Sequence, residues 1–270
     1  MGFFLGDAYQ GAQKRDLLTH ASYYGLPGET VIMPPRFEDE DRSLAAYAYF
    51  GPLKPKQVGA AKVIIDPALP RWIDDLILNT GGKISSYYEK TYQRPLKREL
   101  VLMISVVDLD SSVFSMKGGA TNGQITYRMA GKVLTKESAR MRELVTKIVS
   151  HEMAHIWQDS VDAGGIGEGA AWIHEGGAEM MALDALQQTG IWTIDQVASY
   201  KSKAIEQCNK IKTGAHVYEY DYVCGLQNFM TLNLDAPIIW RALMTETEKT
   251  GKVYSETIVE EVSQRLLQAK

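Results

Sequence analysis

The sequence predicts a protein of the α+β class, with a small sheet first and a mostly helical second half. Short runs rich in β-branched residues, which are typical of buried strands, occur between residues 62 and 129. From Thr135 almost to Lys270, apolar residues instead recur at the spacing of helices. Strands that come first and helices that follow indicate an α+β fold.

Residues 1–60 differ in character from the rest of the chain. They mix aromatic residues with a proline pair and an acidic cluster at residues 38–41, a composition typical of irregular structure. We interpret residues 1–60 as an N-terminal extension that packs on the body of the protein, with one short helix over residues 44–50. Residues 61–270 are interpreted as the main domain.

The first part of the main domain contains three predicted strands and one predicted helix. The strands are expected at residues 63–65, 100–107 and 123–129, where apolar and β-branched residues are bounded by polar ones. Pro70 is typical of the first turn of a helix, and this helix is expected to continue through Ile77.

The second half of the chain is predicted to be a series of helices. Thr135 is expected to cap the first of them, and Leu144, Ile148, His151 and His155 follow it at helical spacing. Further helices are predicted at residues 173–189, 194–211, 222–233, 237–249 and 254–268.

The composition excludes several classes of function. The formal net charge is −4, so the chain has no overall positive field for binding nucleic acid. No segment is apolar for long enough to be a membrane span. The two cysteines, Cys208 and Cys224, are too few for a disulfide framework, and we predict two buried thiols.

The start of the chain does not have the pattern of a signal peptide. Its apolar residues follow no positive charge, and the run reaches Asp7 too early. The cytoplasm is therefore the default prediction for the compartment, and export is predicted if a signal has been removed.

Residues 151–155 carry the clearest chemical signal, the pattern HExxH. On a helix, residues four apart lie on one face, so His151 and His155 can bind the same Zn²⁺ ion while Glu152 stands beside it. Both histidines continue the apolar stripe of their helix, where a charge without a partner would be costly. A divalent cation offsets that cost, and we predict one zinc ion at this position.

Zinc requires a third protein ligand, and the next predicted helix offers two carboxylates four residues apart, Glu175 and Glu179. Glu175 is the predicted ligand. Glu179, one turn later, can accept the free N–H of a ligating histidine and so fix the tautomer of that histidine. Their neighbours Ala178 and Met181 are too apolar for a fully exposed turn.

These motifs resemble those of the gluzincin metallopeptidases, in particular the branch of the zinc aminopeptidases and leukotriene A4 hydrolase. In that branch, eighteen residues follow HExxH before the ligand glutamate of W-x-x-E-G-x-A-E, whereas nineteen residues separate His155 from Glu175. The resemblance implies a thermolysin-like zincin catalytic domain with an edge strand in its small sheet. It also implies a minimal catalytic unit without the flanking domains of the large relatives.

A second stretch, residues 118–128, is similar to the G-x-M-E-N-W-G-L-I-T-Y-R segment of the same branch. In the family this segment is an edge strand whose backbone holds the substrate by β-augmentation. The resemblance therefore implies substrate contacts at Gly118, Gly119, Ala120, Thr121 and Asn122. The family glutamate that grips the free α-amine is missing, because Ala120 or Thr121 stands in its place. Strict recognition of a free amino end is not expected.

The segment Tyr222-Val223-Cys224-Gly225 resembles the family sequence Y-E-K-G, whose tyrosine hydrogen-bonds the developing oxyanion. The resemblance assigns this role to Tyr222. Tyr218, Tyr220 and His216 lie close by in the sequence and stay open as alternatives.

Together the motifs predict zinc-dependent hydrolysis of peptide bonds in a peptide or protein substrate. A metal-activated water would attack, with Glu152 as the general base. Two alternatives stay open: a binding or scaffold protein that contains zinc, and a hydrolase of a non-peptide substrate. Glu152 favours the peptidase, because a structural zinc site gains nothing from a buried general base.

Overall fold

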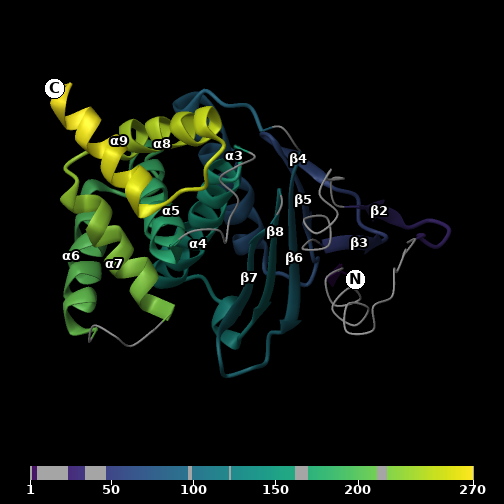
Figure 1. The fold of residues 1–270 in the computed structure, drawn as a ribbon. Helices are drawn as coiled ribbons and strands as arrows, with labels where there is room; N and C mark the ends of the chain where they lie inside the picture. The colour runs from purple at the N-terminus through teal and green to yellow at the C-terminus, as the bar shows by residue number, and fades with distance from the viewer. Residues whose placement is uncertain are drawn as a thin grey trace, which may run out of the picture. The chain divides into compact units, whose positions relative to one another are not determined.

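The computed structural model describes residues 2–4, 24–33, 47–96, 99–121, 123–161, 170–211 and 218–269 (Figure 1). It divides into two compact units. The first, rich in strands, comprises Met1–Leu78 and Lys97–Glu137, and the second, which is helical, comprises Asn79–Leu96 and Ser138–Lys270. The predicted α+β class is confirmed. The boundary near residue 60 stays a prediction.

The strand-rich unit contains two sheets. The smaller is antiparallel, in the order β1 (Gly2–Phe4), β3 (Tyr47–Gly51) and β2 (Thr30–Ile32). The larger has the order β4 (Lys56–Val58), β5 (Ala61–Ile65), β6 (Leu100–Asp108), β8 (Gln124–Ala130) and β7 (Ser115–Thr121). Its inner strands β5, β6 and β8 are parallel, and the edge strands β4 and β7 are antiparallel to their neighbours. All three predicted strands are confirmed.

The helix predicted over residues 44–50 is wrong, because Tyr47–Gly51 form the central strand of the smaller sheet. Tyr49 from this strand packs in a core cluster with Ile64, Val101 and Met103 of the larger sheet. The side chain of Gln124 also exchanges two hydrogen bonds of 2.7 Å with the backbone of Tyr47. The partners of this strand thus lie far away in the sequence, and local pattern does not reveal them.

Edge strand β7 approaches β8 unusually closely at Gly118. Its φ of +142° is a conformation that side chains disfavour, and a Cβ built there would lie 1.8 Å from the carbonyl oxygen of Thr126. Glycine is therefore required at this position by the sheet itself.

The helical unit begins inside α3 (Arg71–Tyr92), which Pro70 precedes as predicted and which continues without interruption through its glycine pair. The remaining helices are α4 (Ala139–Gln158), α5 (Ala171–Gln188), α6 (Ile194–Lys210), α7 (Tyr218–Thr231), α8 (Ala236–Thr250) and α9 (Glu256–Gln268). Helix α5 packs against α4, α6, α7 and α8. Among the described residues, none of the helices is both long and apolar enough to cross a membrane.

The N-terminal cap predicted for α4, Thr135, is wrong. Thr135 ends a short 3₁₀ helix, η1 (Lys132–Thr135), and the hydroxyl of Ser138 caps α4 by accepting a hydrogen bond from the backbone N–H of Met141. Both residues are good caps, and local sequence does not separate them.

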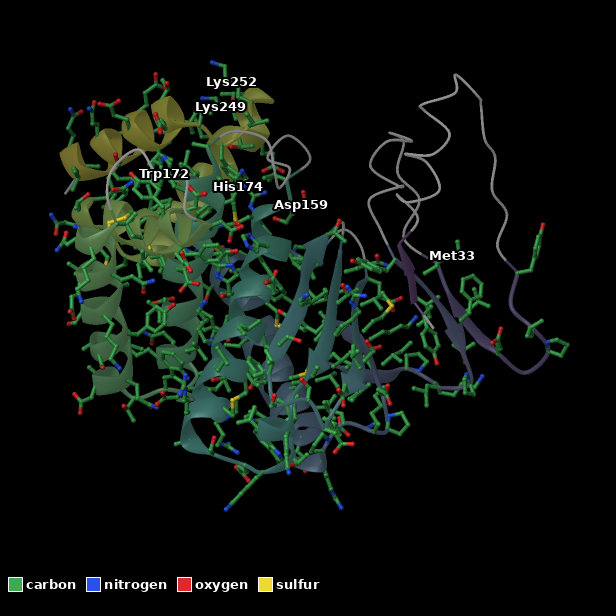
Figure 2. The ribbon with its side chains drawn as sticks, turned by 90° about the horizontal axis from the view of Figure 1, so that it is seen from below. Met33, Asp159, Trp172, His174, Lys249 and Lys252 are labelled. Atoms are coloured by element: carbon green, nitrogen blue, oxygen red, sulfur yellow. A yellow bond between two sulfur atoms is a disulfide. The ribbon has the colours of Figure 1, made fainter. Side chains whose placement is uncertain are left out.

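The two predicted thiols are also wrong, because Cys208 and Cys224 form a disulfide that links α6 to α7 (Figure 2). Their Cα atoms lie 5.0 Å apart, which is within the range that a disulfide requires. The pairing depends on how α6 packs against α7, so the cysteine count alone could not reveal it.

Candidate metal centre

Helix α4 places His151 and His155 on one face, one turn apart, and both side chains are buried. Their Nε2 atoms lie 3.0 Å from each other, and the rings meet edge to face. Two buried imidazole nitrogens that converge on one point are typical of a zinc-binding site.

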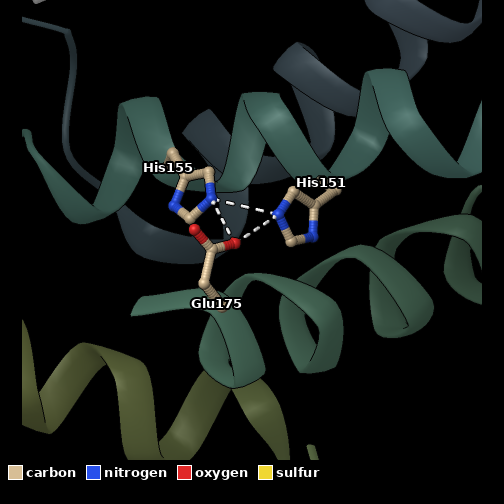
Figure 3. A group of neighbouring side chains, drawn as sticks. All are labelled: His151, His155 and Glu175. Carbon is tan, nitrogen blue, oxygen red and sulfur yellow. Dashed lines mark hydrogen bonds and ion pairs between the residues drawn. The ribbon is translucent and has the colours of Figure 1, made fainter. Parts of the chain in front are cut away.

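Glu175, in the first turns of α5, completes the group (Figure 3). Its Oε2 lies 3.0 Å from Nε2 of His151 and 3.3 Å from Nε2 of His155. Ligand atoms of the three side chains all lie within 4.8 Å of one another. Two imidazole nitrogens and one carboxylate oxygen are a donor set of catalytic zinc sites, so the three residues fit the predicted ion.

The electrostatics of this group suit a cation. Burial alone would lower the pKa of His151, but its contacts with the carboxylates of Glu175 and Glu179 raise the pKa to about 9. Burial alone would raise the pKa of Glu175, but the two imidazoles hold that pKa well below its usual range. Glu175 is therefore a charged carboxylate at neutral pH.

Glu179 lies behind His151, on the side away from the other ligands. Its Oε1 lies 2.9 Å from Nδ1 of His151 and 2.5 Å from Nζ of Lys147, and its Oε2 accepts a hydrogen bond of 2.7 Å from the hydroxyl of Tyr200. Burial would raise the pKa of Glu179, but Lys147 and His151 hold it well below its usual range. The carboxylate of Glu179 thus lies beside Nδ1 of a proposed ligand, and its role as the acceptor that fixes the tautomer of His151 stays a prediction.

Lys147 and Tyr200 anchor Glu179, and neither is among the site residues predicted from the sequence. Lys147 lies one turn before His151 on α4, and that spacing is a usable signal, because a lysine on this face lies beside the metal site. Tyr200 comes from α6, and no sequence spacing connects it with the site.

His155 has a different partner. Its Nδ1 lies 2.8 Å from Oε1 of Gln158, the last residue of α4. Gln158 is not among the predicted site residues either, although it stands three residues after His155 on the same helix.

Helices α5 and α7 touch backbone to backbone beside the site. A Cβ built on Gly176 would lie 2.4 Å from Cα of Gly225, and one built on Gly225 would lie 2.6 Å from the carbonyl oxygen of Trp172. Only glycine fits at either position. Gly176 follows the ligand Glu175, and Gly225 lies one turn after Tyr222.

Beside this crossing, Tyr222 of α7 contacts His151, one of the proposed metal ligands. The ring of Tyr222 stacks on the ring of His151, with 5.3 Å between centroids and 21° between planes. Nζ of Lys147 lies 5.8 Å from the centroid of the same tyrosine ring. Tyr220 lies half-buried on α7, whereas His216 and the side chain of Tyr218 lie outside the described residues.

The remaining predicted site residues that the structure describes lie on α4 and on strand β7. Glu152 is half-buried on α4, between the two histidines in sequence. Gly118, Gly119, Ala120 and Thr121 lie on edge strand β7, and Asn122 lies outside the described residues. The structure thus brings five of the predicted side chains together in the helical unit: His151, His155, Glu175, Glu179 and Tyr222.

Comparison with known proteins adds information about the fold. No protein-family model and no curated protein matches this sequence. Among solved structures, the chain is similar to an aminopeptidase N family protein from Idiomarina loihiensis, with a TM-score of 0.61 and 12% sequence identity. The match covers 86% of this chain and 49% of that chain, so this chain spans about half the length of that protein. The likeness concerns the fold alone, which is similar to that of this aminopeptidase N family protein.

Proposed function

We propose that this protein is a zinc-dependent peptidase in which His151, His155 and Glu175 hold one zinc ion. The observation that carries the proposal is the convergence of two buried Nε2 atoms and one carboxylate oxygen, all within 4.8 Å of one another. A fold shared with an aminopeptidase N family protein supports the same class of reaction.

A zinc ion held by His151, His155 and Glu175 would lower the pKa of a bound water molecule towards neutrality and would polarise the carbonyl group of a substrate. Glu152 accepts the proton of the attacking water and delivers it to the leaving amine. The position of Glu152 between the two histidines of α4 supports this role.

Tyr222 donates a hydrogen bond to the oxyanion that develops as the scissile carbonyl is attacked. Support for Tyr222 over Tyr220 comes from the stacking of its ring on His151. The tyrosine lies on α7, which crosses α5 at a pair of glycines and packs closely against it.

The substrate is a peptide or a segment of a protein. Strand β7 lies at the edge of its sheet, and edge strands can accept an extended peptide as a further strand. Residues 118–121 of β7 carry no acidic side chain that could hold a free α-amine. We therefore propose cleavage that does not require a free amino end.

A pool of quenched peptides with free and with acetylated amino ends tests this function. We expect the zinc-loaded protein to cleave both sets at similar rates, a chelator to abolish cleavage, and added zinc to restore it. Tight binding of zinc without cleavage of any peptide would contradict the proposal and favour a binding or scaffold protein. Cleavage only of the peptides with a free amino end would instead indicate an aminopeptidase.

A further inference from the structure

Gln158 is a buried amide whose polar atoms all have partners. Its side chain is fully buried, its Oε1 lies 2.8 Å from Nδ1 of His155, and its Nε2 donates a hydrogen bond of 3.1 Å to the backbone carbonyl of His174. Its own backbone carbonyl accepts a hydrogen bond of 2.9 Å from the hydroxyl of Tyr254. A buried amide held at every polar atom has one orientation.

The backbone carbonyl of His174 determines that orientation. A carbonyl oxygen can only accept, so the amide nitrogen of Gln158 must face His174, and the amide oxygen must face His155. An amide oxygen also can only accept. Nδ1 of His155 must therefore carry the proton, and in a neutral imidazole this leaves the lone pair on Nε2.

Nε2 is the atom of His155 that faces the metal group. It lies 3.0 Å from Nε2 of His151 and 3.3 Å from Oε2 of Glu175. The hydrogen bonds of Gln158 thus turn the lone pair of His155 towards the point where the ligands converge.

The packing of α5 leaves room for this amide. A Cβ built on Gly177 would lie 3.0 Å from Nε2 of Gln158 and 2.0 Å from the ring of Trp240. His174, labelled in Figure 2 beside Trp172 in the first turn of α5, is itself buried. Gly177 and the carbonyl of His174 together form a slot on α5 that accepts the amide of Gln158.

We infer that Gln158 is a positioning residue, which fixes the Nδ1–H tautomer of His155 and thereby presents its Nε2 lone pair to the metal. The inference rests on the proposed function only in taking His155 as a metal ligand. Nδ1 of His151 instead lies 2.9 Å from the carboxylate of Glu179, so the Nδ1 atoms of the two histidines face a neutral amide and a charged group.

The tautomer of His155 can be measured in the wild-type, metal-free protein by long-range ¹H–¹⁵N NMR. We expect a proton on Nδ1. A free neutral histidine prefers the proton on Nε2 and leaves Nδ1 bare, so a His155 without a proton on Nδ1 would overturn the inference. This measurement needs no variant and no substrate.

Two substitutions test whether Gln158 orients His155 or only connects α4 to α5 by hydrogen bonds. Gln158→Leu keeps the volume and removes both hydrogen bonds, and it should weaken zinc binding about 10- to 100-fold in a competition with a chelating dye. Gln158→Glu keeps an acceptor for Nδ1 but loses the donor to His174. It should keep the tautomer and bind zinc more tightly than Gln158→Leu.

Gln124→Leu is the matched control, because Gln124 is also fully buried and makes two side-chain hydrogen bonds, in its case to Tyr47. It should leave zinc affinity unchanged. Equal zinc affinity of Gln158→Leu and the wild type would overturn the inference, as would equal losses in Gln158→Leu and Gln158→Glu. A wild type that binds zinc with the expected tautomer but cleaves no peptide would contradict the proposed function and leave this inference standing.

Discussion

Gly176 and Gly225 bring the backbones of α5 and α7 into direct contact, so close that a Cβ on Gly176 would lie 2.4 Å from Cα of Gly225. The contact joins two sequence motifs. Glu175 precedes one glycine, and Tyr222 precedes the other by one turn. Because neither glycine has a side chain, the two helices can approach this closely. The approach in turn sets the position of Tyr222 relative to Glu175, the proposed third ligand.

The first prediction concerns this crossing. Gly225→Ala forces a methyl group against the carbonyl oxygen of Trp172, where only 2.6 Å is available. We expect the free energy of unfolding to fall by about 1–3 kcal/mol or more, measured by chemical denaturation.

Gly81→Ala is the matched control, because the nearest atom is the flexible end of Met153, 3.2 Å away. Alanine is also the better helix former by roughly 1 kcal/mol, so little change or a small gain is expected. Equal stability of Gly225→Ala and the wild type would show that the helices can separate at no cost.

The second prediction concerns the hydroxyl of Tyr222. Tyr222→Phe keeps the stacked ring and removes the proposed donor to the oxyanion, so kcat should fall about 100-fold while KM and zinc content stay unchanged. Tyr220→Phe is the control and should retain the wild-type kcat. A larger loss in Tyr220→Phe would transfer the role to Tyr220.

The third prediction concerns the disulfide. Cys208 and Cys224 are separated by 16 residues, and loop closure of about this length stabilises a protein by about 3 kcal/mol. Reductant should lower the stability of the wild type by an amount of this order. The zinc ligands lie on α4 and α5, so zinc should stay bound.

The double variant Cys208→Ser with Cys224→Ser should not respond to reductant. Because Cys224 lies two residues after Tyr222, we also expect a lower kcat in the reduced protein. A wild type whose stability does not change with reductant would contradict the pairing.

The fourth prediction concerns pH. The pKa of His151 in the metal-free protein is raised from 6.5 to about 9, so its protonated form stabilises the fold below pH 6.5. That contribution is lost as pH rises towards 9, and the metal-free protein should become less stable over this range. Zinc must displace the same proton, so zinc affinity should rise with pH by up to about tenfold per unit.

Calorimetry in buffers of different ionisation enthalpy measures the released proton directly. Glu179→Gln removes one of the carboxylates that raise the pKa of His151, and it should reduce proton release near pH 8. Zinc affinity that does not change between pH 7 and pH 9 would contradict the prediction.

The helical half and the proposed metal ligands could be predicted because their signals are local. Apolar spacing indicated α5 to α9, and residues four apart on a helix must share a face, which brings His151 and His155 together. Glu175 and Glu179 followed from the same rule on a second helix.

Strand β3, the disulfide and the contact of Tyr200 could not be predicted, because they depend on packing between distant segments. Strand β3 needs partners from β1 and β2, and the disulfide needs the crossing of α6 and α7. Gln158 near the end of a helix resembles a surface residue until α5 covers it, and Tyr200 reaches Glu179 only after α6 folds back. The contacts of β3, of the disulfide and of Tyr200 have no fixed spacing in the sequence.

In the proposed function, a metal held by His151, His155 and Glu175 acts with Glu152 to hydrolyse peptides. The most direct test is the cleavage rate per bound zinc ion in the wild type and in Glu152→Gln, with Glu260→Gln, an exposed glutamate on α9, as the control. We expect equal zinc content in all three proteins, wild-type cleavage in Glu260→Gln and a loss of at least about 100-fold in Glu152→Gln. Equal cleavage by Glu152→Gln and the wild type would contradict it.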